Sequence, residues 1–285
     1  MKQIVKKLID KVSIFKILFD ILKYVLRKSS ITSVYPIHFD GWKMATGTRT
    51  PWTNGGSSDL SRHFSETDSK LKKLVEEKKI ILTQFKPQNV LAEIEGLMWR
   101  HYLVYWSVNY AVKNTKSKMN KFAEFGVCDG LTIFYAISAA KKSQESFKAY
   151  LYDAWDGMKE ELLLSSEKTS AGSYSYLNLE NTKNNLSHLN VKELIYNKGY
   201  IPEVFDSVKN PEELVWIHID LNSAMPTIRV LEKFWDRLEM GGLILLDDFA
   251  WPGYEDTQAE VEKWACDKKC NILHLPTGQA IVFKL

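Results

Sequence analysis

The sequence has little cysteine and no long uninterrupted hydrophobic run. Its 285 residues include three cysteines, Cys128, Cys266 and Cys270, which are too few for a disulfide framework and lack the second ligand pair of a structural zinc site. Charged side chains interrupt the apolar residues between positions 4 and 26, so no stretch reaches the roughly 18 to 20 apolar residues that span a bilayer. We expect no signal peptide, no membrane crossing and a cytoplasmic location.

The chain also has little net charge, and that charge is unevenly placed. The whole chain carries +3, whereas residues 1–28 carry eight Lys or Arg against Asp10 and Asp20, or +6, which leaves −3 for the remainder. A domain that reads nucleic acid is expected to carry a basic stripe on its folded part. We therefore predict no nucleic-acid partner.

The first 90 residues are predicted to form a helical extension. Apolar residues recur at helical spacing over 2–27, with lysines between them, which indicates an amphipathic helix. Packing on its own domain or on a second copy of the chain is the favoured role, and contact with the inner membrane face is the alternative.

Residues 30–66 are predicted to be loop, with 42–58 as a lid. Helical spacing returns over 67–80 and 89–113, the second segment ending in an aromatic stripe that we assign to the core.

From Lys121 the pattern changes to short apolar runs that alternate with helical stretches, which is typical of βαβ units in a parallel sheet. We predict a domain over 91–285 with an α/β fold, in which a mostly parallel seven-stranded sheet ends in an antiparallel hairpin across Pro276–Gly278. The predicted strands are 121–126, 148–153, 192–196, 214–220, 242–247, 271–275 and 279–284.

The first predicted strand leads into a glycine-containing turn and a helix. Glu124, Gly126 and Gly130 follow the spacing E-x-G-x-x-x-G, and glycine permits a tight turn at the strand end where open α/β sheets bind ligands. The dinucleotide fingerprint G-x-G-x-x-G is not matched, because its second glycine, which lets the backbone approach a pyrophosphate, is missing. An ordinary strand-to-helix turn is the plainer alternative.

Acidic residues end three further strands. Asp153 closes the second strand, where a carboxylate can accept hydrogen bonds from both ribose hydroxyls of a nucleoside. Asp220 ends the fourth strand, and the histidine two residues before it is assigned to the core. The fifth strand ends in Asp247 and Asp248. Adjacent acids at a buried strand end need a hydrogen-bond network or a cation, and with Asp220 they offer the oxygen ligands that Mg²⁺ prefers. Helix capping and solvation are the alternative.

In this order the four motifs resemble the macrocin O-methyltransferase family, bacterial enzymes that methylate sugar hydroxyls with S-adenosylmethionine and a divalent metal. The resemblance runs from about Met98 to Leu285. It includes Asn197–Phe205, similar to the glycine-aromatic stretch after the family's third strand, and Ile272–Lys284, similar to relatives found with polysaccharide biosynthesis. It implies a Rossmann-like methyltransferase fold of class I.

The resemblance also implies roles for the strand-end residues. The methionine end of the donor would be held by Glu124 and Gly126 and its ribose by Asp153, and Gly130 would belong to the same donor-binding loop. A divalent metal would be bound by Asp220, Asp247 and Asp248, and their oxygen ligands favour Mg²⁺. Asp220 would also be the base that takes the proton of a sugar or polyol hydroxyl. The family often follows this first aspartate with a second acid and a tyrosine, where the present sequence has Leu221, Asn222 and Ser223.

Two alternatives from other classes stay open. A non-catalytic scaffold or membrane-surface protein could keep this fold, and the basic N-terminal segment and the altered residues after Asp220 favour it. A nucleotide-dependent oxidoreductase is disfavoured by the missing glycine. Carboxylates at all the relevant strand ends favour catalysis, since a scaffold gains nothing from them.

Overall fold

The computed structural model describes residues 59–143 and 146–285, all within one compact unit, Phe39–Leu285. The amphipathic helix predicted over 2–27 and the lid predicted over 42–58 lie outside the described residues. Within the described part, no helix combines the length and the apolar character needed to cross a membrane. The predicted domain boundary at residue 90 stays a prediction.

A seven-stranded sheet forms the centre of the unit, in the order β3-β2-β1-β4-β5-β7-β6. The pairs β1–β2, β1–β4, β2–β3 and β4–β5 are parallel, whereas β7 pairs antiparallel with both β5 and β6. The predicted α/β fold with a terminal hairpin is thus confirmed. The strands are β1 (Asn120–Phe125), β2 (Phe147–Asp153), β3 (Leu194–Lys198), β4 (Leu214–Ile219), β5 (Leu238–Leu246), β6 (Ile272–His274) and β7 (Ala280–Phe283).

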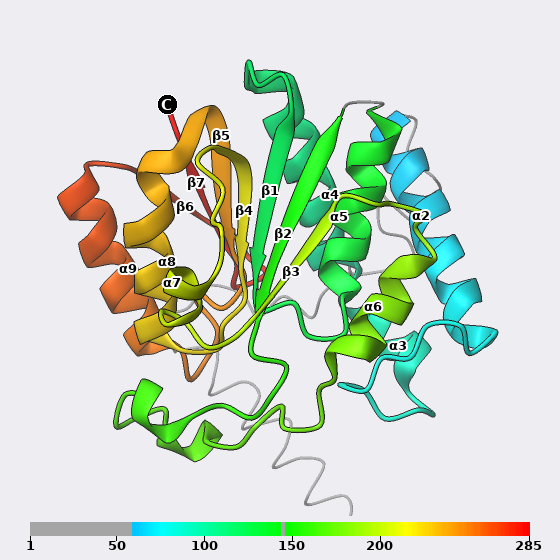
Figure 1. Cartoon of the computed structure of the whole chain (residues 1–285), viewed down its shortest axis with the longest axis horizontal. Coiled ribbons are helices and arrows are strands. Elements are labelled where there is room, and N and C mark those ends of the chain that lie inside the picture. The colour runs from blue at the N-terminus through cyan, green and yellow to red at the C-terminus, as the bar shows by residue number, and fades with distance from the viewer. Residues whose placement is uncertain (1–58, 144–145) are drawn as a thin grey trace, which may run out of the picture. The chain divides into compact units, whose positions relative to one another are not determined.

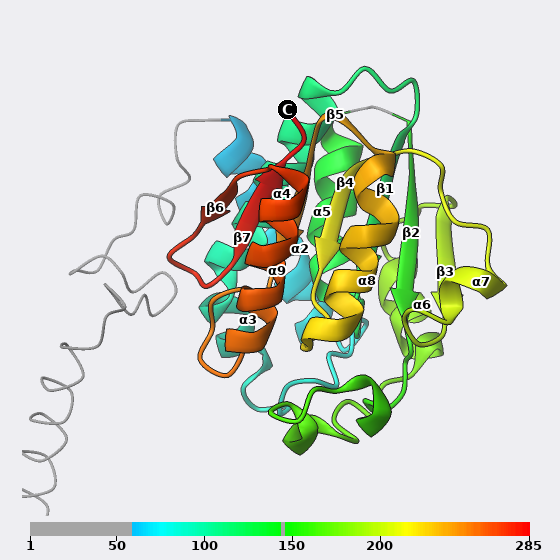
Figure 2. The ribbon, with the colours of Figure 1, turned by 90° about the vertical axis from the view of Figure 1, so that its left-hand side faces the viewer.

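Helices cover both faces of the sheet, and each face has its own buried apolar cluster. The two clusters exist because β1, β4 and β5 are apolar on both faces, as strands of a parallel sheet are expected to be. Figures 1 and 2 show two helical layers. One contains α2 (Asp59–Glu76), α4 (Met98–Asn114) and α5 (Leu131–Lys142); the other contains α7 (Val204–Ser207), α8 (Ala224–Phe234) and α9 (Glu255–Lys268). The remaining helices are α3 (Val90–Gly96) and α6 (Leu179–Ser187).

Helix α2 begins at Asp59, so the loop predicted to extend to residue 66 is wrong over its last eight residues. The buried face of α2 contains Phe64 and Leu71, but also Thr67 and Asp68. Asp68 accepts a hydrogen bond from the buried Tyr135 hydroxyl at 2.7 Å. Within the missed segment 59–66 the buried residues are Ser61 and Phe64, which are too few apolar positions to show a helical repeat.

The carboxyl ends of the central strands lie together at one edge of the sheet. Backbone hydrogen bonds continue past the strand ends: Gly126 donates to Tyr152, Asp220 to Phe125, and Asp247 to Ile219, at 2.8–2.9 Å. This aligns the residues that follow β1, β4 and β5. The segment between β2 and α6 lies beyond these strand ends, in the lower part of Figure 1.

Candidate functional site

A cavity of about 620 Å³ opens at the carboxyl edge of the sheet. Of the predicted site residues, Gly126, Asp153, Asp220 and Asp248 line it, and Asp247 lines a smaller neighbouring cavity of about 60 Å³. The volume lies within the range of small-molecule sites, and the position is the one where open α/β sheets bind ligands. Neither cavity is lined by Glu124 or Gly130.

Gly126 is required where the chain leaves β1. Its φ is +86°, and a Cβ at this position would overlap the backbone carbonyl of Asp220. Only glycine combines this left-handed backbone with so close an approach. The turn therefore brings the end of β1 directly against the end of β4, as the predicted donor loop requires.

Asp153 holds the loop that follows β1. One carboxylate oxygen accepts a hydrogen bond from the backbone N–H of Cys128 at 2.8 Å, and the other accepts from Trp155 at 2.6 Å. Burial raises the pKa of Asp153, and these backbone hydrogen bonds oppose the rise. Because each oxygen has a second lone pair, the carboxylate can still accept a hydrogen bond from a ligand in the cavity.

Glu124 lies inside the sheet layer rather than in the cavity. It is opposite His218 in the β1–β4 pairing, and its carboxylate is 2.9 Å from the Nδ1 atom of that histidine. Both side chains are fully buried, which confirms the assignment of His218 to the core. Burial raises the pKa of Glu124 to about 7, although the histidine lowers it in part. The arrangement favours a structural role, and donor binding by Glu124 stays a prediction.

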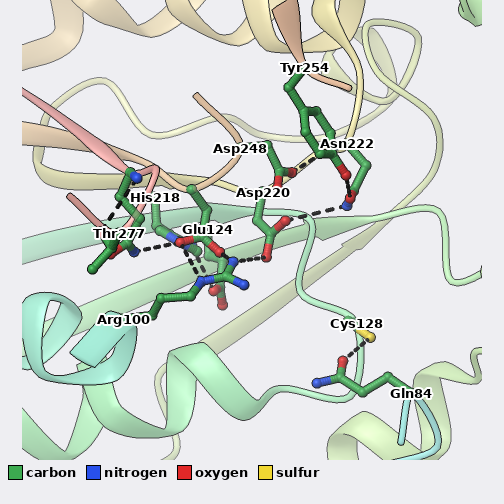
Figure 3. A network of polar contacts seen from close by, with 12 residues as sticks. Gln84, Arg100, Glu124, Cys128, His218, Asp220, Asn222, Asp248, Tyr254 and Thr277 are labelled. Carbon is green, nitrogen blue, oxygen red and sulfur yellow. Dashed lines mark hydrogen bonds and ion pairs between the residues drawn. The ribbon is translucent and has the colours of Figure 1, made fainter. Parts of the chain in front are cut away.

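Three carboxylates follow β4 and β5, and an arginine joins two of them (Figure 3). The Arg100 Nε atom donates to Asp247 Oδ1 at 3.1 Å, and its Nη2 atom is ion-paired with Asp247 Oδ2. The same Nη2 atom lies 3.8 Å from Asp220 Oδ2. Burial, and then the neighbouring Asp220 carboxylate, raise the pKa of Asp248 well above its ordinary value.

This arrangement does not fit the predicted three-carboxylate metal site. Both oxygens of Asp247 bind the guanidinium, and the Gln279 amide also donates to Oδ1. Across residues 59–143 and 146–285, no group of three or more His, Cys, Asp or Glu side chains is placed to hold a metal ion. A metal role for Asp220, Asp247 and Asp248 stays a prediction from the resemblance, and the contacts of Asp247 do not favour it.

Asn222 joins the segments at the mouth of the cavity. Its Oδ1 atom accepts hydrogen bonds from the hydroxyls of Tyr254 at 2.6 Å and Tyr174 at 3.2 Å. Its Nδ2 atom donates to Asp220 Oδ1 at 3.3 Å, and its backbone N–H donates to Asp248. Figure 3 shows Asn222 between Tyr254 and Asp220. Asn222 thus connects Asp220 and Asp248 with two tyrosine hydroxyls.

Sequence reasoning missed Arg100, Gln279 and the two tyrosines. A usable signal existed for Arg100, since it is the only Asp, Glu, Lys or Arg between Met98 and Val112, in a helix with many buried side chains. A single charged residue in such a helix needs a partner in the interior. No comparable signal marks Gln279, because its contact with Asp247 joins residues 32 positions apart.

Comparisons with known proteins agree with this geometry. Residues 123–249 match the sequence model of a family described as a methyltransferase domain. The O-methyltransferase NovP is similar in structure, with a TM-score of 0.57 and 13% identity over 65% of this chain and 79% of that one. The calicheamicin methyltransferase CalS11 is also similar, with a TM-score of 0.51 and 16% identity over 84% and 98%. No curated protein matches the sequence.

The fold is therefore that of Rossmann-like methyltransferases. The matched segment begins in β1 and ends just after Asp248, so it contains the turn at Gly126, the end of β2 and the three carboxylates after β4 and β5. The family match and the cavity lead to the same edge of the sheet. The similarity to a methyltransferase domain is that of residues 123–249.

Proposed function

We propose that the protein transfers a methyl group from S-adenosylmethionine to a hydroxyl of a sugar or related polyol. The observation that carries the proposal is the position of Asp220. It borders the cavity at the end of β4, directly beside the Gly126 turn. A base at this point faces the space that the donor loop and the acceptor must share.

The donor half of the cavity fits a nucleoside ligand. Gly126 leaves the loop backbone uncovered by a side chain, and Asp153 lines the cavity at the end of β2, where a carboxylate can accept from ribose hydroxyls. When bound, S-adenosylmethionine supplies an electrophilic methyl group. Gly126 and Asp153 hold the donor in this proposal; no donor contact is drawn from Glu124 or Gly130, because neither lines the cavity.

The acceptor half of the cavity is lined by aromatic side chains that also carry polar groups. They are Tyr174, Tyr176, Trp251 and Tyr254. The hydroxyls of Tyr174 and Tyr254 donate to Asn222, so their oxygen lone pairs remain free to accept hydrogen bonds from a ligand. Flat apolar surfaces edged with acceptors suit a ring that has C–H faces and hydroxyl edges. The description of NovP as an O-methyltransferase agrees with oxygen as the acceptor atom.

Asp220 is the proposed general base. An alcohol is a weak nucleophile at neutral pH, so its proton must leave as the new bond forms. Asp220 takes that proton while the acceptor oxygen bonds to the methyl carbon and the carbon–sulfur bond breaks. S-adenosylhomocysteine and the methyl ether are the products. No step depends on a metal, because the predicted metal role of the three aspartates does not fit the contacts of Asp247.

Other expectations from the sequence also remain proposals. They are a cytoplasmic location, contact of residues 2–27 with the inner membrane face, self-association, and a role in polysaccharide biosynthesis. Residues 2–27 lie outside the described part of the chain, and none of the contacts described above bears on the other three.

Transfer of a labelled methyl group tests the proposed function. The purified full chain is incubated with labelled S-adenosylmethionine and a panel of nucleotide-linked sugars and free polyols. Removing a general base lowers kcat by about 10²–10⁴-fold, so Asp220→Asn should lose transfer on that scale while it still binds S-adenosylhomocysteine. The matched control is Asp267→Asn, at an exposed position in α9. Full activity of Asp220→Asn contradicts the assignment of the base.

A further inference from the structure

We infer that Arg100 is the resident cation of the carboxylate cluster, so that its guanidinium occupies the place of a divalent metal and positions Asp220. The catalytic part of this inference depends on the proposed function, whereas the exclusion of a metal ion does not. Its basis is the set of contacts that Arg100 makes at the ends of β4 and β5 (Figure 3).

Helix α4 delivers the arginine to this place. It packs against α5, β4 and β5, and Met98, two residues before Arg100, and His101, directly after it, are buried. The Arg100 side chain itself is 24% exposed and points to the strand ends. A charge on such a helix needs a partner in the interior, because unpaired burial of an ion is costly.

The contact with Asp247 is a fork-to-fork pair. Two guanidinium nitrogens meet the two carboxylate oxygens, which is the strongest geometry for an arginine and a carboxylate. Asp247 is 2% exposed and also accepts from the Gln279 amide. Because the guanidinium faces both oxygens of Asp247, a metal ion would have to displace this cation or lie beside it against charge repulsion.

Asp220 is held from two directions. Its Oδ2 atom faces Arg100 Nη2 at 3.8 Å, and its Oδ1 atom accepts from the Asn222 amide at 3.3 Å. Among the described residues that line the cavity, the other cationic side chain is Lys159, and its ammonium lies 4.1 Å from the centre of the Tyr200 ring instead. Arg100 is thus the cation that holds the base, and we assign it a positioning role rather than direct contact with substrate.

Binding of Mn²⁺ to the purified full chain tests the exclusion of a metal without any measurement of activity. Hard divalent ions need free carboxylate oxygens, so the wild type should bind Mn²⁺ no more tightly than about 1 mM by calorimetry. Arg100→Gln releases Asp247 and Asp220 and should bind Mn²⁺ at least about 10-fold more tightly. Wild-type binding below about 100 µM that Asp247→Asn abolishes overturns the inference.

Kinetics test the positioning role. Because a misplaced base slows chemistry without weakening donor binding, Arg100→Gln should lower kcat by about 10-fold or more while the affinity for S-adenosylhomocysteine is unchanged. Arg100→Lys keeps the charge but loses the fork, and should recover part of kcat. Methyl transfer by the wild type should persist in EDTA. If EDTA abolishes transfer and added Mg²⁺ restores it, the inference is contradicted. If Arg100→Gln does not fold, the wild-type Mn²⁺ titration and the EDTA assay still decide.

Failure of the proposed function gives a different pattern. If the folded wild type does not bind S-adenosylhomocysteine, the methyltransferase proposal is wrong whatever the Mn²⁺ result. If it binds S-adenosylhomocysteine and also binds Mn²⁺ tightly through Asp247, the proposed function stands and only the role of Arg100 fails.

Discussion

The two halves of the cavity hold their carboxylates by different means. In the proposed donor half, Asp153 accepts from the backbone N–H groups of Cys128 and Trp155. In the other half, Asp248 lies against Asp220, and Asp247 in the smaller neighbouring cavity is held by Arg100 and Gln279. Main-chain contacts fix the first half, whereas side chains from distant positions assemble the second. The backbone around the ends of β1 and β2 thus sets the first arrangement, whereas the second depends on the side chains that surround it.

The loop that follows β1 contains a second buried carboxylate, which backbone and side-chain donors hold together. Asp129 Oδ2 accepts from the N–H groups of Thr83 and Gln84, at 2.5 and 3.1 Å, and its Oδ1 atom accepts from the Asn181 amide at 2.7 Å. The segment before α3 is therefore bound to the loop that follows β1. Gln84 extends this connection, because its carbonyl accepts from the Cys128 thiol.

The largest effect is expected where the two halves meet, at Gly126. In Gly126→Ala the new Cβ meets the Asp220 carbonyl on a backbone with φ +86°, so strain and overlap together should cost about 3 kcal/mol or more. We expect thermal unfolding to fall by about 6 °C or more, or no soluble protein.

The control for Gly126→Ala separates strain from overlap. Gly172 has φ +77°, and a Cβ there would have no neighbour within 4 Å. Gly172→Ala should therefore show the conformational cost alone, about 1–2 kcal/mol. Equal losses in the two variants contradict the close approach of β1 and β4 that joins the halves.

A smaller effect is expected beneath the cavity, at Glu124. Its pKa is about 7 in the fold against 4.5 ordinarily, so the folded state binds more protons between these values. The stability from this group is complete below pH 4.5 and is lost as the pH rises through about 7.

Glu124→Gln removes this titration, so its unfolding temperature should change less between pH 5 and 7.5 than that of the wild type. Between these two pH values the unfolding temperature of the wild type should change by about 3 °C or more beyond that of the variant, which is the shift that about 1 kcal/mol produces in a domain of this size. The exposed Glu260→Gln in α9 should follow the wild type. Parallel curves for Glu124→Gln and the wild type would show that the pair does not titrate in this range.

The same contrast explains what the sequence could predict. Strand ends with Gly126, Asp153, Asp220 and the Asp247–Asp248 pair were predictable, because the apolar periods of β1, β2, β4 and β5 place them at one edge of the sheet. The roles of Arg100 and Gln279 were not, since they depend on how α4 and β7 pack on the sheet. The start of α2 was missed because residues 59–66 bury a single large apolar side chain, Phe64, beside Ser61, which shows no apolar repeat.

Calorimetric titration of the folded full chain with S-adenosylhomocysteine tests the central claim most directly. We predict wild-type binding in the range of about 10 µM. Asp153→Asn should weaken it by about 10-fold or more, since a buried hydrogen bond to a ligand contributes about 1–3 kcal/mol. The exposed Asp267→Asn should bind as the wild type does. The absence of binding to the folded wild type, or equal binding by Asp153→Asn, contradicts a donor site at the ends of β1 and β2.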